Sequence, residues 1–177
     1  MPISLDDRRD HRVDATTVNR LDAARADSQR HLPSKTGNPV GLLLNIEVEA
    51  PLRQLHKDGY QLAILTNDSE SSAKRNMRDI GVLDLFCTVV GADSGFGSKP
   101  VPHGFLHCCQ IAGATPAASI MVGDTMADYG AAIAAKAGDF ICVADSIDNR
   151  PHQDIHHENV IGRIDQLPAL MARRSLR

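Results

Sequence analysis

The stretch SIMVGDTMAD, residues 119–128, contains in order the signals of a strand, a turn and a helix. Its first four residues form a mostly apolar run that predicts a buried strand, and Gly123-Asp124 ends this run with a polar turn. The alanine-rich residues 127–137 that follow predict a helix, with Gly138 as its stop signal. A strand that leads through a turn into a helix is the repeating half of a β-α-β unit.

The same alternation of strand and helix signals continues on both sides of this stretch. Further strands are predicted over residues 60–65, 87–90 and 140–143, and further helices over residues 49–58, 69–80 and 102–111. Strands and helices that alternate at this spacing predict parallel pairing, so the fold class is α/β, with a doubly wound parallel sheet. In such sheets ligands bind beyond the carboxyl ends of the strands.

Length and composition limit the possible classes of protein. The 177 residues suit one domain, since roughly 100–200 residues make a domain. The formal net charge of -3 and the absence of Trp disfavour nucleic acid as a partner. No apolar run is long enough to span a bilayer, and the first ten residues lack the apolar core of a signal peptide. We therefore expect a cytoplasmic protein with no membrane partner.

The amino-terminal part differs in texture from the rest. Residues 1–35 are dense in charge, with a thin apolar stripe that predicts a helix over about residues 14–30. Residues 33–39 have the composition of a linker. We therefore expect two parts: a helical segment with its linker over residues 1–39, and the α/β core over residues 40–177.

Polar side chains follow the predicted strands at their carboxyl ends. Thr66 and Asn67 come after one strand, Lys99 lies in the loop after the next, and Asp124 and Asp128 follow a third. A threonine hydroxyl can donate to a phosphoryl oxygen, and a lysine can offset its charge. Carboxylates are ligands suited to Mg²⁺. A metal ion together with a lysine is the usual means of stabilising charge during phosphoryl transfer.

These residues carry a resemblance to a known family. The segments LAILTN (residues 62–67), Lys99-Pro100 and IMVGDTMAD (residues 120–128) resemble motifs II, III and IV of the haloacid dehalogenase (HAD) superfamily, and within it the phosphoglycolate-phosphatase-like hydrolases. The resemblance covers about residues 48–143. It implies a HAD-like Rossmannoid core, with residues 1–39 as a short remnant of the family's cap.

The resemblance also implies a chemistry. In the family, a motif I aspartate attacks phosphorus and forms an aspartyl-phosphate, and a second aspartate acts as acid and base. Carried over residue by residue, Thr66, Asn67 and Lys99 would bind the phosphoryl group. Asp124 would hold Mg²⁺, and Asp128 would be a second or water-mediated ligand. The expected partner is a small phosphorylated metabolite.

Motif I itself, an apolar strand ending in Asp-x-Asp, does not occur in this chain. Asp6 or Asp7 follows a short apolar lead, but Arg8 stands where the acid/base carboxylate belongs. Asn45 and Glu47 follow a better apolar lead, but an asparagine amide cannot act as the carboxylate nucleophile. A chain without a functional motif I is the third alternative.

The missing motif affects the fold as well as the chemistry, because its strand is central in the family's sheet. Residues 1–5 or residues 42–44 could occupy this position, or another chain could, which makes a homodimer possible. Two functions remain open. The first is a Mg²⁺-dependent phosphatase acting on a small phosphate monoester, and the second is a catalytically inactive HAD-like domain that binds phosphate, Mg²⁺ or a partner.

Overall fold

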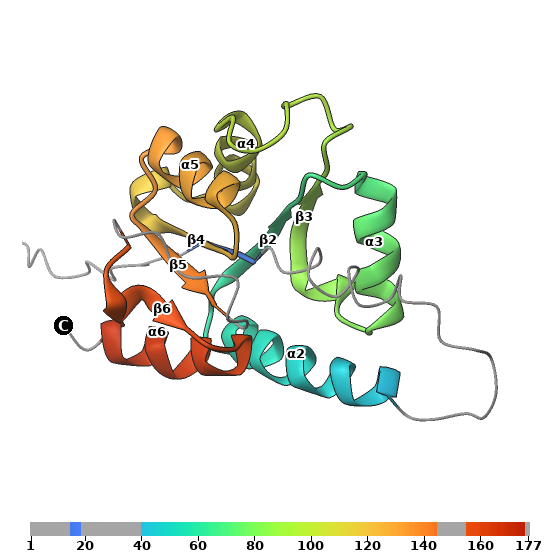
Figure 1. Ribbon diagram of the computed structural model, residues 1–177. Coiled ribbons are helices and arrows are strands. Elements are labelled where there is room, and N and C mark those ends of the chain that lie inside the picture. Colours follow the sequence, from blue (N-terminus) through green and yellow to red (C-terminus); the bar gives the residue numbers. More distant parts are fainter. Residues whose placement is uncertain (1–14, 19–39, 145–154, 176–177) are drawn as a thin grey trace, which may run out of the picture.

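A single sheet of six parallel strands forms the centre of the molecule. The computed structural model describes residues 15–18, 40–144 and 155–175, and its strands lie in the order β3-β2-β1-β4-β5-β6 (Figure 1). The strands are β1 (Ala15–Val18), β2 (Gln61–Leu65), β3 (Phe86–Val90), β4 (Ser119–Gly123), β5 (Asp139–Val143) and β6 (Val160–Ile161). All five neighbouring pairs are parallel. The predicted α/β class with a doubly wound parallel sheet is confirmed.

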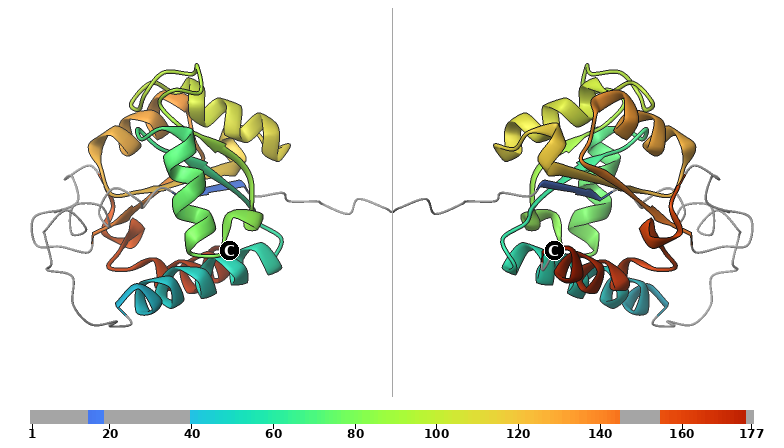
Figure 2. Two further views of the ribbon diagram at one scale, coloured as in Figure 1. Left: turned by 90° about the vertical axis from the view of Figure 1, so that its right-hand side faces the viewer. Right: turned by 90° about the vertical axis from the view of Figure 1, so that its left-hand side faces the viewer.

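Helices cover both faces of this sheet, which gives three layers (Figures 1 and 2). The α-helices are α2 (Val40–Lys57), α3 (Glu70–Asp79), α4 (His103–Ala112), α5 (Met126–Ala135) and α6 (Leu167–Ser175). Short 3₁₀ turns are η1 (Leu83–Leu85), η2 (Pro116–Ala118), η3 (His157–Asn159) and η4 (Ile164–Gln166). Helices α4 and α5 lie on one face, and α2, α3 and α6 lie on the other.

Successive residues of each buried strand feed two separate cores, because side chains alternate between the faces of a sheet. In β2, Leu62 and Ile64 pack with Leu52 and Leu55 of α2 on one face. Ala63 and Leu65 of the same strand pack with α4 and α5 on the other face. Strands buried on both faces read as continuous apolar runs, which is the pattern seen in the sequence.

The central position of the sheet is occupied by β1, and this overturns two expectations. Strand β1 pairs with β2 on one side and β4 on the other, with Thr17 opposite both Ala63 and Met121. The helix predicted from residue 14 is therefore wrong over residues 15–18, while its remainder lies outside the described residues. Backbone groups on the facing edges of β2 and β4 need partners, and this requirement outweighs a weak helical stripe.

Two segments of this chain were expected as the central strand, and of these residues 1–5 lie outside the described residues. Residues 42–44 belong to α2, which begins at Val40 rather than at the predicted residue 49 and continues through Pro51. A proline lacks the backbone N–H that a helix interior uses, so it is more common in the first turn of a helix. Pro51 is therefore compatible with a helix that begins near residue 49, although the helix extends further toward the amino terminus. Because this chain supplies its own central strand, the argument for a homodimer loses its structural reason. A division at residue 39 would assign residues 15–18 to the amino-terminal segment, but in the structure they form a strand of the core sheet.

The four cysteines are free thiols. Cys108, Cys109 and Cys142 are buried, and Cys87 is exposed on β3. Burial raises the pKa of the Cys108 thiol to about 12, so this thiol stays protonated. Among the described helices, none combines the length and the apolar character that crossing a membrane requires.

The loops that leave β2 and β3 are joined by close backbone contacts. Thr66 N donates to Val90 O at 2.9 Å, and Ala92 N donates to Asp68 O at 2.8 Å. Between these contacts, Gly91 passes so near the start of α3 that a Cβ atom there would lie 2.2 Å from Glu70 N. Only glycine fits this crossing, which fixes the direction in which the β3–α4 loop departs.

Gly91→Ala should lower the free energy of unfolding by about 3 kcal/mol, because the added methyl meets backbone atoms that cannot move aside. Urea unfolding followed by circular dichroism measures this. Gly162→Ala is the matched control, since its Cβ would have its nearest neighbour, Gln166 Oε1, at 3.8 Å. The control should change stability by no more than about 0.5 kcal/mol. Equal stability of the two variants would contradict the close crossing.

Candidate phosphate site

Five polar residues gather at the carboxyl edge of the sheet, and we call them the carboxyl rim. Thr66 and Asn67 follow β2 directly, Asp124 follows β4, and Asp128 lies in the first turn of α5. Lys99 lies in the loop between β3 and α4. Parallel strands end at the same edge, so the topology brings these segments together, with β1 between β2 and β4.

The strongest interaction in the carboxyl rim is a buried ion pair. Lys99 Nζ donates to Asp128 Oδ1 at 2.6 Å, and the two side chains are only 2% and 0% exposed. The same ammonium donates to Leu65 O, at the end of β2, at 3.2 Å. Two of its three protons are thus directed by protein acceptors, and one remains for another acceptor. The pair joins the β3–α4 loop to α5 across the sheet edge.

The second carboxylate oxygen of Asp128 is held by Thr125. Asp128 Oδ2 accepts from Thr125 N at 3.0 Å and from Thr125 Oγ1 at 2.6 Å, while Asp128 N donates to Thr125 Oγ1 at 3.3 Å. These reciprocal bonds form a capping box at the start of α5. A Cβ at Gly123 would lie 2.5 Å from Asp128 Cβ, so glycine is needed for Asp128 to sit here.

Asn67 is paired with the backbone of Lys99 rather than with another side chain. Lys99 N donates to Asn67 Oδ1 at 2.8 Å, and Asn67 Nδ2 donates to Lys99 O at 3.1 Å. The two bonds connect the β2 loop to the β3–α4 loop across 32 positions of sequence. They leave one amide N–H of Asn67 that Lys99 does not use. Sequence reasoning marked this residue only as a phosphate ligand.

Thr66 and Asp124 complete the carboxyl rim on the two sides of β1. Thr66 is buried, and its Oγ1 accepts from Asp68 N at 3.1 Å, so its hydroxyl proton can still be donated elsewhere. Asp124 is half-buried. The charges of Asp124 and Asp128, after the larger effect of burial, raise the pKa of the Cys142 thiol. Both carboxylates therefore lie near the end of β5, where Lys99 matches the charge of Asp128.

The two carboxylates differ in their fitness for a metal ion. Both oxygens of Asp128 receive hydrogen bonds from protein groups, and the residue is fully buried. Asp124 is half-buried at the strand end, which suits a direct ligand of a hydrated cation. In the part of the chain that the structure describes, no three His, Cys, Asp or Glu residues are grouped as a metal site. Mg²⁺ needs only one or two carboxylates beside water and phosphate oxygens, so the Asp124 donor fits it.

The candidates for the missing nucleophile have different outcomes. Asn45 and Glu47 lie within helix α2, so the prediction that they end a central strand is wrong. Asp6 and Asp7 lie outside the described residues. The strand that occupies the central position ends at Val18, which pairs with Val122 just before Gly123-Asp124. In the sequence Val18 is followed by Asn19 and Arg20, not by a carboxylate.

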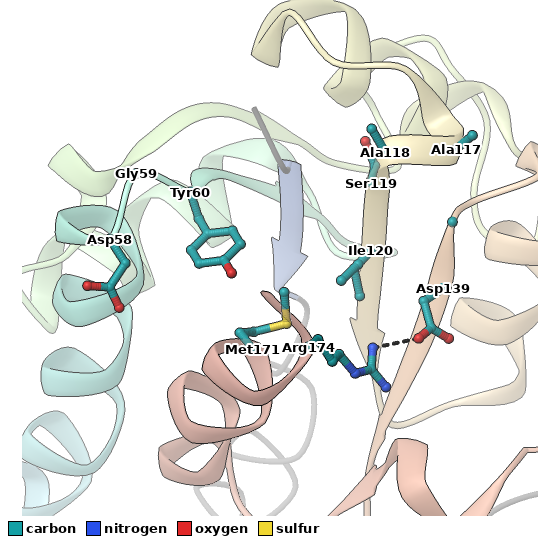
Figure 3. A pocket seen from close by; sticks show the side chains of 11 residues that line it. Asp58, Gly59, Tyr60, Ala117, Ala118, Ser119, Ile120, Asp139, Met171 and Arg174 are labelled. Carbon is teal, nitrogen blue, oxygen red and sulfur yellow. Dashed lines mark hydrogen bonds and ion pairs between the residues drawn. The ribbon is translucent and has the colours of Figure 1, made fainter. Parts of the chain in front are cut away.

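A cavity of about 400 Å³ lies at the opposite end of the sheet, so it is separate from the carboxyl rim (Figure 3). Tyr60, Ser119 and Asp139, at the amino ends of β2, β4 and β5, line it together with α6. Arg174 Nη1 donates to Asp139 Oδ2 at 2.5 Å at its edge. Asn159 completes this group by donating to Asp139 Oδ1 and accepting from Arg174 Nη2, each at 2.6 Å. The group attaches α6 to the sheet.

Comparison with known families gives a match over most of the described core. A family profile described as haloacid dehalogenase-like hydrolase matches residues 41–136. The match includes Thr66, Lys99, Asp124 and Asp128, and it begins after β1.

Individual relatives agree with that match. The chain is 32% identical over 124 residues to a phosphoglycolate phosphatase of Cereibacter sphaeroides, covering 70% of this chain and 55% of the relative. It is 33% identical over 124 residues to a probable phosphoglycolate phosphatase of Pseudomonas putida, covering 70% and 48%. A HAD phosphatase structure from Thermococcus onnurineus superposes with a TM-score of 0.61 at 25% identity, covering 71% and 56%. The chain thus spans about half the length of the curated relatives it matches.

Asp128→Asn should destabilise the protein by about 3–5 kcal/mol, because it leaves the Lys99 ammonium buried without its counter-charge. The amide also turns an N–H toward either Lys99 or Thr125, both of which are donors. Lys99→Met/Asp128→Leu should recover part of this loss, since it removes both charges. Chemical denaturation gives the comparison.

An exposed ion pair provides the matched control for this variant. Arg53 Nε lies 2.7 Å from Glu49 Oε1, and both side chains are well exposed. Glu49→Gln should therefore cost less than about 1 kcal/mol. If Asp128→Asn cost no more than Glu49→Gln, the buried pair would not be a principal support of the carboxyl rim.

Glu70 should make the stability of the β3–α4 loop dependent on pH. Hydrogen bonds from Lys74 and then from Ser94 lower the pKa of the Glu70 carboxyl. A lowered folded-state pKa stabilises the protein above the unfolded value of about 4.3, and this contribution disappears as pH falls through the folded value. The difference in stability between wild type and Glu70→Gln, measured by urea unfolding, should therefore be present at pH 7 and shrink as the pH falls through the lowered pKa of Glu70. A difference that did not shrink would contradict this.

Proposed function

This chain belongs to the haloacid dehalogenase-like hydrolase family, and we propose that it is a Mg²⁺-dependent phosphatase that hydrolyses a small phosphate monoester. Phosphoglycolate, named for the relatives, and sugar phosphates are the substrate class to test. The observation that carries this proposal is the buried Lys99–Asp128 pair, which holds an ammonium at the carboxyl rim beside Leu65 O, at the end of β2.

The residues of the carboxyl rim would divide the work as follows. Lys99 keeps one proton for a phosphoryl oxygen and offsets its charge, while Asp128 holds the ammonium in place. Thr66 donates its hydroxyl proton to a second phosphoryl oxygen. Asp124, rather than Asp128, is the direct ligand of Mg²⁺, since the oxygens of Asp128 are engaged. A bound Mg²⁺ would supply screening between an anionic nucleophile and the anionic phosphate.

Turnover through an aspartyl-phosphate further needs a carboxylate that reaches phosphorus from this chain. Asp6 and Asp7 are the candidates before β1. Because β1 occupies the central position, the first carboxylate after it in the sequence, Asp22, becomes a third candidate. The carboxylate would attack phosphorus, the alcohol of the ester would leave with a proton, and water would then hydrolyse the acyl phosphate.

A second function is favoured by the sequence that follows β1. Val18 is succeeded by Asn19 and Arg20, whereas the neighbouring strands β2 and β4 are succeeded by Thr66 and Gly123-Asp124. A rim that retains its cation and lacks its nucleophile would bind phosphate with Mg²⁺ and not turn it over. This second candidate is a phosphate-binding, catalytically inactive member of the family.

Phosphate release from p-nitrophenyl phosphate and phosphoglycolate with Mg²⁺ separates the two functions. A phosphatase should lose about a hundredfold or more of its rate in Asp124→Ala, because a charge-stabilising group is removed. Asp84→Ala is the matched control, since Asp84 is an acidic residue of η1 distant in the fold from the carboxyl rim. It should keep the wild-type rate.

The nucleophile is assigned by three further variants in the same assay. Only one of Asp6→Asn, Asp7→Asn and Asp22→Asn should abolish release, while the others leave it intact. If wild type released no more phosphate than Asp124→Ala, the phosphatase proposal would fail. Saturable binding of inorganic phosphate without turnover, measured by calorimetry, would then support the inactive phosphate-binding domain.

A further inference from the structure

We propose that Asn67 is a positioning residue, which acts by holding the backbone of Lys99 and not as a ligand of the phosphate. This inference rests on the proposed phosphate site and assigns one of its residues a different task from the one the sequence suggested. Its basis is the two-point contact in which Lys99 N donates to Asn67 Oδ1 and Asn67 Nδ2 donates to Lys99 O.

Lys99 needs to be held both at its ammonium group and at its backbone. Its side chain is fixed at the tip by Asp128 Oδ1 and Leu65 O. The 2.6 Å bond from Lys99 Nζ to Asp128 Oδ1 keeps the ammonium in one place only if the backbone of Lys99 is also held. Between the Gly91 crossing and Lys99, the β3–α4 loop contains Gly95 and Gly97, which have no Cβ atom to restrict the backbone that leads to the lysine.

Hydrogen bonds hold the β3–α4 loop near its start and near its end. At its start, the loop is joined to the segment that leads from β2 into α3: Ala92 N donates to Asp68 O at 2.8 Å, and Ser94 Oγ donates to Glu70 Oε2 at 2.6 Å. Near its end, within the described residues, Asn67 hydrogen-bonds both the N–H and the C=O of Lys99. Asn67 thus repeats at the lysine the kind of connection that begins the loop.

The orientation of the Asn67 carboxamide suits the backbone of Lys99. The Asn67 carboxamide meets both the N–H and the C=O of one residue, as a neighbouring strand would, at 2.8 and 3.1 Å. If the amide oxygen faced a phosphate, two acceptors would be brought together, so Oδ1 serves the Lys99 N–H and not a phosphate. The second Nδ2 proton is the one group of this amide that the contact with Lys99 leaves over, so the experiment must distinguish positioning from direct binding.

The experiment measures the backbone of Lys99 and phosphate binding separately, in the full chain. Amide hydrogen exchange, followed by NMR, should show the Lys99 N–H exchanging about tenfold or more faster in Asn67→Ala than in wild type. Asn67→Asp keeps the acceptor for that N–H and should retain most of the protection. Neither measurement requires a bound ligand or turnover.

Binding of inorganic phosphate with Mg²⁺ is then measured by calorimetry. Asn67→Ala should weaken it about tenfold or more through the displaced ammonium, with the Lys99 Nζ resonance shifted even before phosphate is added. Asn159→Ala is the matched control, because Asn159 also makes two side-chain hydrogen bonds, at the opposite end of the sheet. It should lose similar stability and bind phosphate as wild type does.

The outcomes separate the alternatives. Weakened phosphate binding with unchanged Lys99 amide exchange and Nζ resonance would make Asn67 a direct ligand and overturn the proposal. Unchanged exchange and unchanged binding would overturn it as well. If wild type bound no phosphate, the proposed function would fail, and faster Lys99 exchange in Asn67→Ala with a shifted Nζ resonance would still establish the positioning role.

Discussion

The buried ion pair between Lys99 and Asp128 is the constraint on which the carboxyl rim depends. A lysine at 2% exposure is tolerable only where its charge is matched, and the matching carboxylate at 0% exposure needs its own donors. Thr125 supplies those donors and, in the same bonds, starts helix α5. Charge neutralisation, helix initiation and loop placement are therefore a single arrangement, and a change in one of them disturbs the other two.

Much of this arrangement follows from the sequence, because the signals involved are local. The apolar runs that end at Thr66 and Gly123-Asp124 are buried strands, and their order implies a parallel sheet whose carboxyl ends meet. Thr66, Lys99 and Asp124 were located in this way at the correct strand ends and in the correct loop. Their roles toward phosphate and Mg²⁺ remain proposals, since position on a rim does not establish binding.

What the sequence could not supply depends on contacts between distant segments. Ala15–Val18 is four residues long and lies in a charge-dense region, so its three β-branched residues form too short a run to predict a strand by themselves. It becomes a strand because β2 and β4 leave a place between them. The task of Asn67 was missed for the same reason, since its partner is 32 positions away. For Asp128, the three-residue spacing from Thr125 is a local signal of the capping box that the two residues form at the start of α5.

The support of the carboxyl rim and its chemistry are separable in this chain. Among the described residues, the hydrogen bonds that orient Lys99 come from the β2 loop, the end of β2 and α5, and none of these bonds requires a residue of motif I. A chain can therefore lose the nucleophile and still keep a well-oriented ammonium at the end of its sheet. Conversely, the presence of the buried Lys99–Asp128 pair supports the proposed phosphate site and does not, by itself, support turnover. The two proposed functions therefore differ in one point, which is whether a carboxylate of this chain reaches a phosphoryl group beside that ammonium.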